Sequence, residues 1–193
     1  MVDLVSLFNH LAEKSDGQLR WDNKDRAWTR WMFQCFDDYM VPTYSTGGIS
    51  EYMEIDRVWR DTNLGYITLG FEHENNFGRE DFLTHEIQHL IDLKATYKVA
   101  ITYPQHGEEE ETIKEICDLI SRNTILSLPQ PFQEEYLIIF GFATRKEGQS
   151  VILWKGYRIN NVGKLLDTQT KVVVQAFNQN PEPTHDQTAF NGR

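Results

Sequence analysis

The chain has 193 residues, of which 40% are hydrophobic and 25% charged, and its formal net charge is -10 at pH 7. This length suffices for one domain with a sizeable core, and no apolar run approaches the roughly 20 residues that cross a bilayer, so we expect no membrane contact. The acidic balance argues against a broad nucleic-acid footprint, although a local basic groove is compatible with an acidic total.

The cysteines and the N-terminal segment indicate the cellular compartment in which the protein is expected. Cys35 and Cys117 are the only cysteines, and both lie among apolar residues in helical-looking segments. We expect two reduced, buried thiols rather than a disulfide. The first residues include an acid, Asp3, and no basic region, unlike a secretory signal. These features favour a cytoplasmic protein.

The N-terminal part of the chain predicts two helices followed by a loop. Apolar residues recur at helical spacing over 2–14, which is typical of an amphipathic helix. The same spacing returns over 25–40, and Pro42 stops this second helix. The segment 43–50, with two consecutive glycines, is expected to be a loop.

The middle of the chain predicts a hairpin, a helix and a strand. Residues 51–60 alternate loosely between apolar and polar types, 61–65 form a turn cluster, and 66–74 alternate more strictly. This pattern indicates a β-hairpin. A helix is expected over 79–95 and a short strand over 97–103.

The remaining elements complete a mixed fold. An acidic run opens a helix that extends to about residue 122, where its acids favour the helix dipole. Segments 135–143 and 150–159 indicate a second hairpin, and the pattern weakens from Asn161 onward. The element order predicts an α/β fold, with a central mixed β-sheet flanked by helices on both faces.

The sequence indicates one domain and a tail. We expect a single domain over 1–177 with its core at 51–104. The segment 178–193 is rich in Asn, Gln and Pro and is expected to be a loose tail.

A zinc-protease motif lies within the helix expected at 79–95. His85, Glu86 and His89 form H-E-x-x-H, in which two imidazoles one helical turn apart bind Zn²⁺ and the glutamate activates the bound water. No third ligand follows at a distinctive spacing, and the helix leads at once into a strand. We therefore expect no zinc at this histidine pair, and keep a zinc metalloprotease as the second alternative.

Acidic residues gather on the predicted hairpin. Glu54 and Asp56 share one side of its first strand, while Glu72 and Glu74 share one side of the second. A register that places Glu54 or Asp56 opposite Glu72 collects three or four carboxylates, which repel one another unless a cation lies among them. Hard oxygen ligands of this kind select Mg²⁺ or Mn²⁺ and suit phosphodiester cleavage.

The order of acidic residues and elements in this region resembles a known nuclease core. Asp56 is followed by Glu72-x-Glu74 at the end of an apolar strand, and then by a helix and the strand 98–103. This arrangement is similar to the core of the PD-(D/E)XK, or restriction-endonuclease-like, nuclease superfamily. The resemblance implies that Asp56, Glu72 and Glu74 are catalytic, with Glu74 at the position usually held by lysine. It also implies Asp56, Glu72 and Glu54 as ligands of Mg²⁺ or Mn²⁺. Some restriction enzymes carry Glu at the lysine position.

The resemblance implies further roles and leaves alternatives open. The family often has another acid on an N-terminal helix, for which Glu13, Asp37 and Asp38 qualify equally, and Gln88 is a candidate assisting residue. The implied activity is an Mg²⁺-dependent endonuclease acting on DNA or RNA. A domain without the lysine can instead be an inactive binding or regulatory module, whose acidic surface suits a protein partner or a second copy of the chain.

Overall fold

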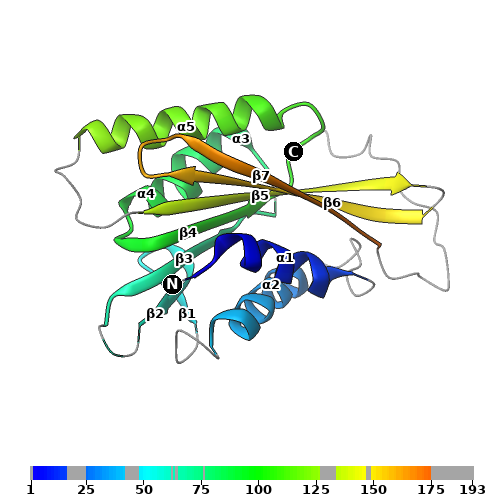
Figure 1. The fold of residues 1–193 in the computed structure, drawn as a ribbon, viewed down its shortest axis with the longest axis horizontal. Helices are drawn as coiled ribbons and strands as arrows, with labels where there is room; N and C mark the ends of the chain where they lie inside the picture. Colours follow the sequence, from blue (N-terminus) through cyan, green and yellow to red (C-terminus); the bar gives the residue numbers. More distant parts are fainter. Residues whose placement is uncertain are drawn as a thin grey trace.

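A mixed β-sheet forms the centre of the molecule (Figure 1), and in the described part of the chain it has seven strands in chain order from β1 to β7. The computed structural model describes residues 2–16, 25–41, 48–61, 63, 65–75, 77–126, 134–146 and 149–174. Helices pack on both faces of the sheet, so the predicted α/β fold is confirmed.

The first three strands form an antiparallel meander. They are β1 (Ile49–Tyr52), β2 (Ile55–Arg60) and β3 (Ile67–His73). The expected hairpin is confirmed as β2 and β3, with Arg57 paired to Phe71. The single strand expected over 51–60 is wrong, because Met53 and Glu54 form a turn with positive φ angles of 51° and 67° that separates β1 from β2.

Two crossovers make the centre of the sheet parallel. β3, β4 (Ala95–Thr102) and β5 (Glu135–Lys146) run in the same direction. A continuous helix over 79–92 joins β3 to β4 and comprises α3 (Arg79–Asp81), the π-helix η1 (Phe82–Ile87) and α4 (Gln88–Asp92). It ends three residues before the expected 95, since Leu93 adopts an extended backbone. α5 (Glu109–Leu126) joins β4 to β5.

The C-terminal strands are antiparallel. The second expected hairpin is confirmed, and its strands β5 and β6 (Gln149–Asn160) are longer than predicted. The edge strand β7 (Leu165–Val174) was not predicted, and its side chains are mostly exposed on both faces, so the sequence lacks a one-sided apolar pattern there. The expected tail over 178–193 lies outside the described residues.

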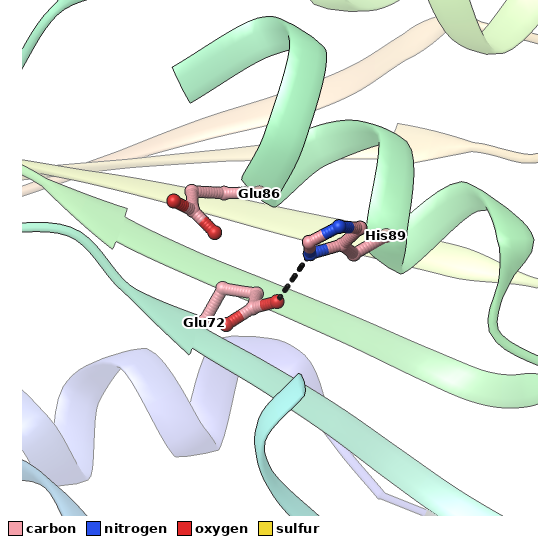
Figure 2. A group of neighbouring side chains, drawn as sticks. All are labelled: Glu72, Glu86 and His89. Atoms are coloured by element: carbon pink, nitrogen blue, oxygen red, sulfur yellow. Dashed lines mark ion pairs between the residues drawn. The ribbon is translucent and has the colours of Figure 1, made fainter. Parts of the chain in front are cut away.

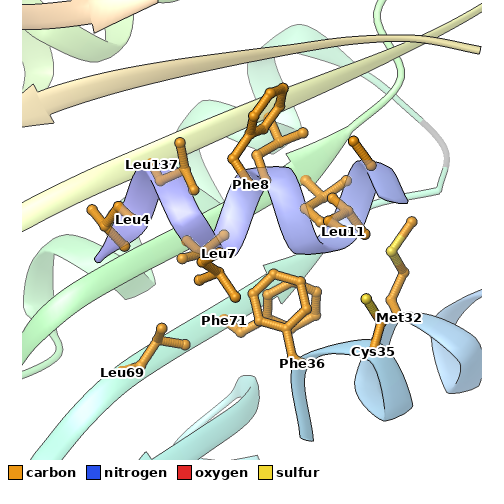
Figure 3. Packing of buried hydrophobic residues seen from close by; sticks show 14 of the residues in the cluster. Leu4, Leu7, Phe8, Leu11, Met32, Cys35, Phe36, Leu69, Phe71 and Leu137 are labelled. Carbon is orange, nitrogen blue, oxygen red and sulfur yellow. The ribbon is translucent and has the colours of Figure 1, made fainter. Parts of the chain in front are cut away.

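The two faces of the sheet carry separate apolar cores. α1 (Leu4–Ser15) and α2 (Asp25–Met40) pack on one face, where Leu7 of α1 and Phe36 of α2 point toward Phe71 of β3 (Figure 3). The helix 79–92 and α5 pack on the other face. The helices described in the structure include none that is long and apolar enough to cross a membrane.

Candidate metal centre

The carboxylates of Asp56 and Glu72 lie together where the β2–β3 ladder ends. The regular pairing stops at Arg57 and Phe71, so the next positions face each other without ladder hydrogen bonds. The Asp56 amide donates instead to Glu72 Oε2 at 3.1 Å, and the His73 amide donates to Asp56 Oδ2 at 2.8 Å. The hairpin therefore brings Asp56 beside Glu72, as the alternation of the two strands predicts.

The helix 79–92 adds two further side chains to these carboxylates. Glu86 and His89 point toward Glu72 (Figure 2), and the three residues offer ligand atoms that all lie within 4.8 Å of one another. The distance from His89 Nδ1 to Glu72 Oε1 is 3.6 Å. Because residues three apart share a helix face, the spacing of Glu86 and His89 lets both reach the strand.

Glu74 completes an acidic cluster that we call the carboxylate cluster: Asp56, Glu72, Glu74 and Glu86. Glu74 follows β3 directly, and its amide donates to the Ile101 carbonyl of β4 at 2.9 Å. Its carboxylate lies close enough to Glu86 to raise the pKa of that group. The cluster is thus built from the ends of β2 and β3 and from one face of the helix.

Burial and mutual repulsion raise the pKa values within the carboxylate cluster. The pKa of Glu72 rises to about 9, chiefly through burial and then through the nearby Asp56. Burial, followed by the charges of Glu74 and Asp56, raises the pKa of Glu86 to about 7. Burial also raises the pKa of Asp56, although the hydrogen bond from the His73 amide opposes the shift. These directions reflect the unfavourable ionisation of buried, neighbouring carboxyl groups without a nearby cation.

Asp56, Glu72 and Glu86 lack compensation from lysine and arginine side chains in the described part of the chain. Among the described residues, no lysine or arginine forms an ion pair with Asp56, Glu72 or Glu86. The Glu72 side chain is only 2% exposed, and its Oε1 makes no hydrogen bond to any described residue; the same holds for the buried Nδ1 of His89. Unsatisfied buried atoms cost roughly 1–3 kcal/mol each. A divalent cation fits here, because it would satisfy both atoms and offset the repulsion.

Glu54 lies at the rim of the cluster. Its side chain is 82% exposed, and its Oε2 is 3.4 Å from His89 Nε2, on the far side of the ring from Glu72. Glu51, Met53 and Glu54 all have positive φ angles, which non-glycine residues adopt at a cost of about 1–3 kcal/mol each. The strained turn therefore directs Glu54 toward the histidine.

Several expected site residues lie elsewhere. Gln88 donates to Asp92 on the same helix at 3.0 Å. His85 is exposed, and its Nδ1 lies 3.2 Å from the Asp81 carbonyl. Its ring centroid is 6.4 Å from that of His89, but His85 is not among the three residues whose ligand atoms converge. Among the acids expected from N-terminal helices, Asp37 pairs with Arg57 and Asp38 with Lys14, and Glu13 is an exposed residue of α1.

The opposite face of β3 anchors the end of the strand that carries the cluster. His73 points away from its two acidic neighbours, with Nε2 2.7 Å from Tyr103 Oη and Nδ1 3.1 Å from Thr29 Oγ1 of α2. The indole of Trp28 donates to the same Tyr103 hydroxyl. Burial lowers the pKa of His73 to about 3, so this ring is neutral and holds the strand in place rather than balancing the acidic charge.

Comparison of the chain with family models, with curated proteins and with solved structures found no match. The joint position of Glu86 and His89 beside Glu72 was not predicted, because the H-E-x-x-H motif suggested a separate site for the helix residues. Their spacing of three residues shows that they share a helix face, but the sequence does not show that this face turns toward Glu72.

Proposed function

We propose that the chain is a divalent-metal-dependent nuclease, with a restriction-endonuclease-like core, that hydrolyses phosphodiester bonds in DNA or RNA. The contact of Asp56 with Glu72 at the ends of adjacent antiparallel strands carries the proposal. Glu74 follows on the same side of β3, and a helix then crosses to the parallel strand β4. This arrangement is similar to that of the PD-(D/E)XK superfamily.

Asp56 and Glu72 would hold Mg²⁺ or Mn²⁺, since both are oxygen donors that face each other with insufficient compensation. The bound ion supplies Lewis-acid stabilisation of the phosphoryl oxygens and lowers the pKa of water. The carboxylate cluster offers a phosphodiester no positive charge in the absence of such an ion, so the activity is strictly dependent on a divalent cation.

Glu74 takes the position at which the superfamily usually carries lysine. A carboxylate there can accept the proton of the attacking water, and its neighbour Glu86 lies close enough to hydrogen-bond with it. The amide of His73 holds Asp56 in place during the reaction. The chain thus provides a positioned base directly after β3 and a fixed ligand on β2.

The rival motif is less well supported by the geometry. A zinc protease needs both histidines of H-E-x-x-H on one ion, whereas His85 faces the Asp81 carbonyl and His89 faces Glu72. We also place the protein in the cytoplasm, because Cys35 and Cys117 are free thiols, one buried and one half-buried.

Cleavage assays test the proposal directly. We expect the full chain to cut plasmid DNA, single-stranded DNA or RNA with Mg²⁺ or Mn²⁺ and to be inactive with EDTA. Glu72→Ala should lower the rate by about 10²-fold or more, because it removes a ligand and its charge stabilisation. Glu13→Ala, a change of an exposed glutamate on α1, is the control and should leave the rate unchanged. No cleavage of the three substrates, with no binding of Mn²⁺, would favour an inactive binding or regulatory module.

A further inference from the structure

We propose that Glu86 and His89 of the helix 79–92 bind the same cation as Glu72, and that this mixed nitrogen and oxygen set makes the centre prefer a first-row transition ion such as Mn²⁺ over Mg²⁺. The inference deepens the proposed function and rests on it for the role of the ion. Its test measures metal binding alone, so this inference and the proposed nuclease activity can be refuted independently.

The three side chains converge closely enough for one ion. Their ligand atoms lie within 4.8 Å of one another. Atoms bound to a common ion at roughly 2.0–2.2 Å are at most about 4.4 Å apart, so only a small movement is needed to close the set. The donors come from two elements, because Glu72 lies on β3 and the other two lie on the helix.

Two buried atoms point to a ligand between them. Glu72 Oε1 and His89 Nδ1 face each other at 3.6 Å, beyond hydrogen-bonding distance, and neither has a hydrogen-bond partner in the described part of the chain. Buried polar atoms normally have a hydrogen-bond partner. It is therefore unusual that a carboxylate oxygen and a ring nitrogen face each other here without one. A cation bound by both atoms would give each of them a partner.

The far side of the His89 ring also fits a ligating histidine. A histidine that binds a metal usually directs its other ring nitrogen to a carboxylate, which fixes the tautomer and the ring plane. Here Glu54 Oε2 lies 3.4 Å from His89 Nε2. The strained turn that carries Glu54 therefore has a role as a positioning element for His89, rather than as a source of a direct ligand.

The helix is held at a fixed height above the sheet. Gly70 of β3 leaves space for Leu93, whose Cδ2 lies 2.2 Å from the position that a Cβ would take. At the end of the helix, the buried Lys98 of β4 donates to the Ile91 carbonyl at 3.3 Å and pairs with Glu134 at 2.6 Å. Such support keeps Glu86 and His89 in register with Glu72.

The donor set decides the preference between ions. Mg²⁺ prefers an all-oxygen octahedral shell, whereas imidazole is a good ligand for transition ions. Removal of His89 should therefore weaken the binding of Mn²⁺ much more than that of Mg²⁺. Removal of the Glu86 carboxylate should weaken the binding of both ions.

Binding measurements on the metal-free full chain test the inference. Mn²⁺ binding is followed by electron paramagnetic resonance, and Mg²⁺ binding by its competition with Mn²⁺. We expect the His89→Ala variant to lose about 10-fold or more in Mn²⁺ affinity, with less than about threefold change for Mg²⁺. His85→Ala is the matched control, since it makes the same change four residues earlier on the same helix at an exposed position, and it should bind Mn²⁺ as the wild type does.

Other outcomes separate the hypotheses. Circular dichroism checks that each variant folds, and His89→Gln replaces the alanine variant if that one does not. Unchanged Mn²⁺ affinity in a folded His89 variant would overturn the inference, and so would an equal loss in His85→Ala, which would instead favour the H-E-x-x-H zinc motif. Dependence of Mn²⁺ binding on His89 without any cleavage would leave the inference standing and refute the nuclease.

Discussion

The buried carboxyl of Glu72 should make the metal-free protein less stable as pH rises, and Glu72→Gln should remove much of this loss. The pKa of Glu72 is raised from 4.5 to about 9 in the folded state, so the folded protein holds a proton that the unfolded chain has released throughout this window. The unfolded state then binds fewer protons, and the free energy of unfolding falls as pH rises from 4.5 to about 9. Glutamine mimics the protonated carboxyl and carries no proton to lose.

The magnitude follows from the pKa shift. Each pKa unit corresponds to about 1.4 kcal/mol, so a window from 4.5 to about 9 sets a ceiling on the order of 6 kcal/mol. Asp56 and Glu86 titrate within the same cluster and share this cost with Glu72. We therefore expect the free energy of unfolding of Glu72→Gln to exceed that of the wild type by about 2 kcal/mol at about pH 8. For a chain of this size, this difference corresponds to an increase of roughly 4–8 °C in Tm.

Thermal unfolding with EDTA, followed by circular dichroism from about pH 5 to about pH 8, measures this difference. The two proteins should have similar Tm values at about pH 5, and their Tm values should diverge as the pH approaches about 8. Added Mn²⁺ should reverse the order if the proposed centre binds the ion, because the ligand would be the ionised carboxylate of the wild type. Glu13→Gln, an exposed change of the same kind, should follow the wild type. A Glu72→Gln variant less stable than the wild type at about pH 8 without metal would contradict the raised pKa of Glu72.

Three further changes test other parts of the structure. Lys98→Ala should lower the free energy of unfolding in urea by about 3 kcal/mol, because it leaves the half-buried Glu134 without its cationic partner and with only the Tyr136 hydroxyl among the partners described; an effect below about 1 kcal/mol would contradict this. Gly163→Ala should cost about 1–3 kcal/mol more in urea than Gly107→Ala. Both glycines have positive φ, but only at position 163 would a Cβ meet a backbone carbonyl, 2.1 Å away. Glu74→Lys, which creates the usual pattern of the PD-(D/E)XK superfamily, should retain DNA or RNA cleavage that Glu74→Ala loses, and equal inactivity of the two would argue against that resemblance.

The sequence predicted the hairpin under the site because both of its strands alternate, and alternation fixes which side chains share a face. It therefore also predicted that Asp56 approaches Glu72. It could not predict the break between β1 and β2, because Met53 and Glu54 adopt positive φ angles without the glycine that usually marks such a turn. β7 was missed for a related reason, since an edge strand exposed on both faces leaves no apolar period.

The helix residues of the site could not be placed from the sequence. H-E-x-x-H puts His85 and His89 on adjacent turns, and the pattern contains nothing about which of them the packing turns toward the sheet. The orientation of the helix depends on the packing of Leu90 and Leu93 against Gly70 of β3. The apolar pattern of the helix alone does not reveal this contact. The π-helical turn over 82–87 also changes the helical phase on which such reasoning relies.

The most direct test of the metal centre is anomalous diffraction from crystals of the protein soaked in Mn²⁺. The structure predicts an anomalous peak within coordination distance of Glu72, Glu86 and His89, with Asp56 beside it and His85 outside the ligand set. A peak held by His85 and His89 away from Glu72, or no peak at this position at saturating Mn²⁺, would contradict it.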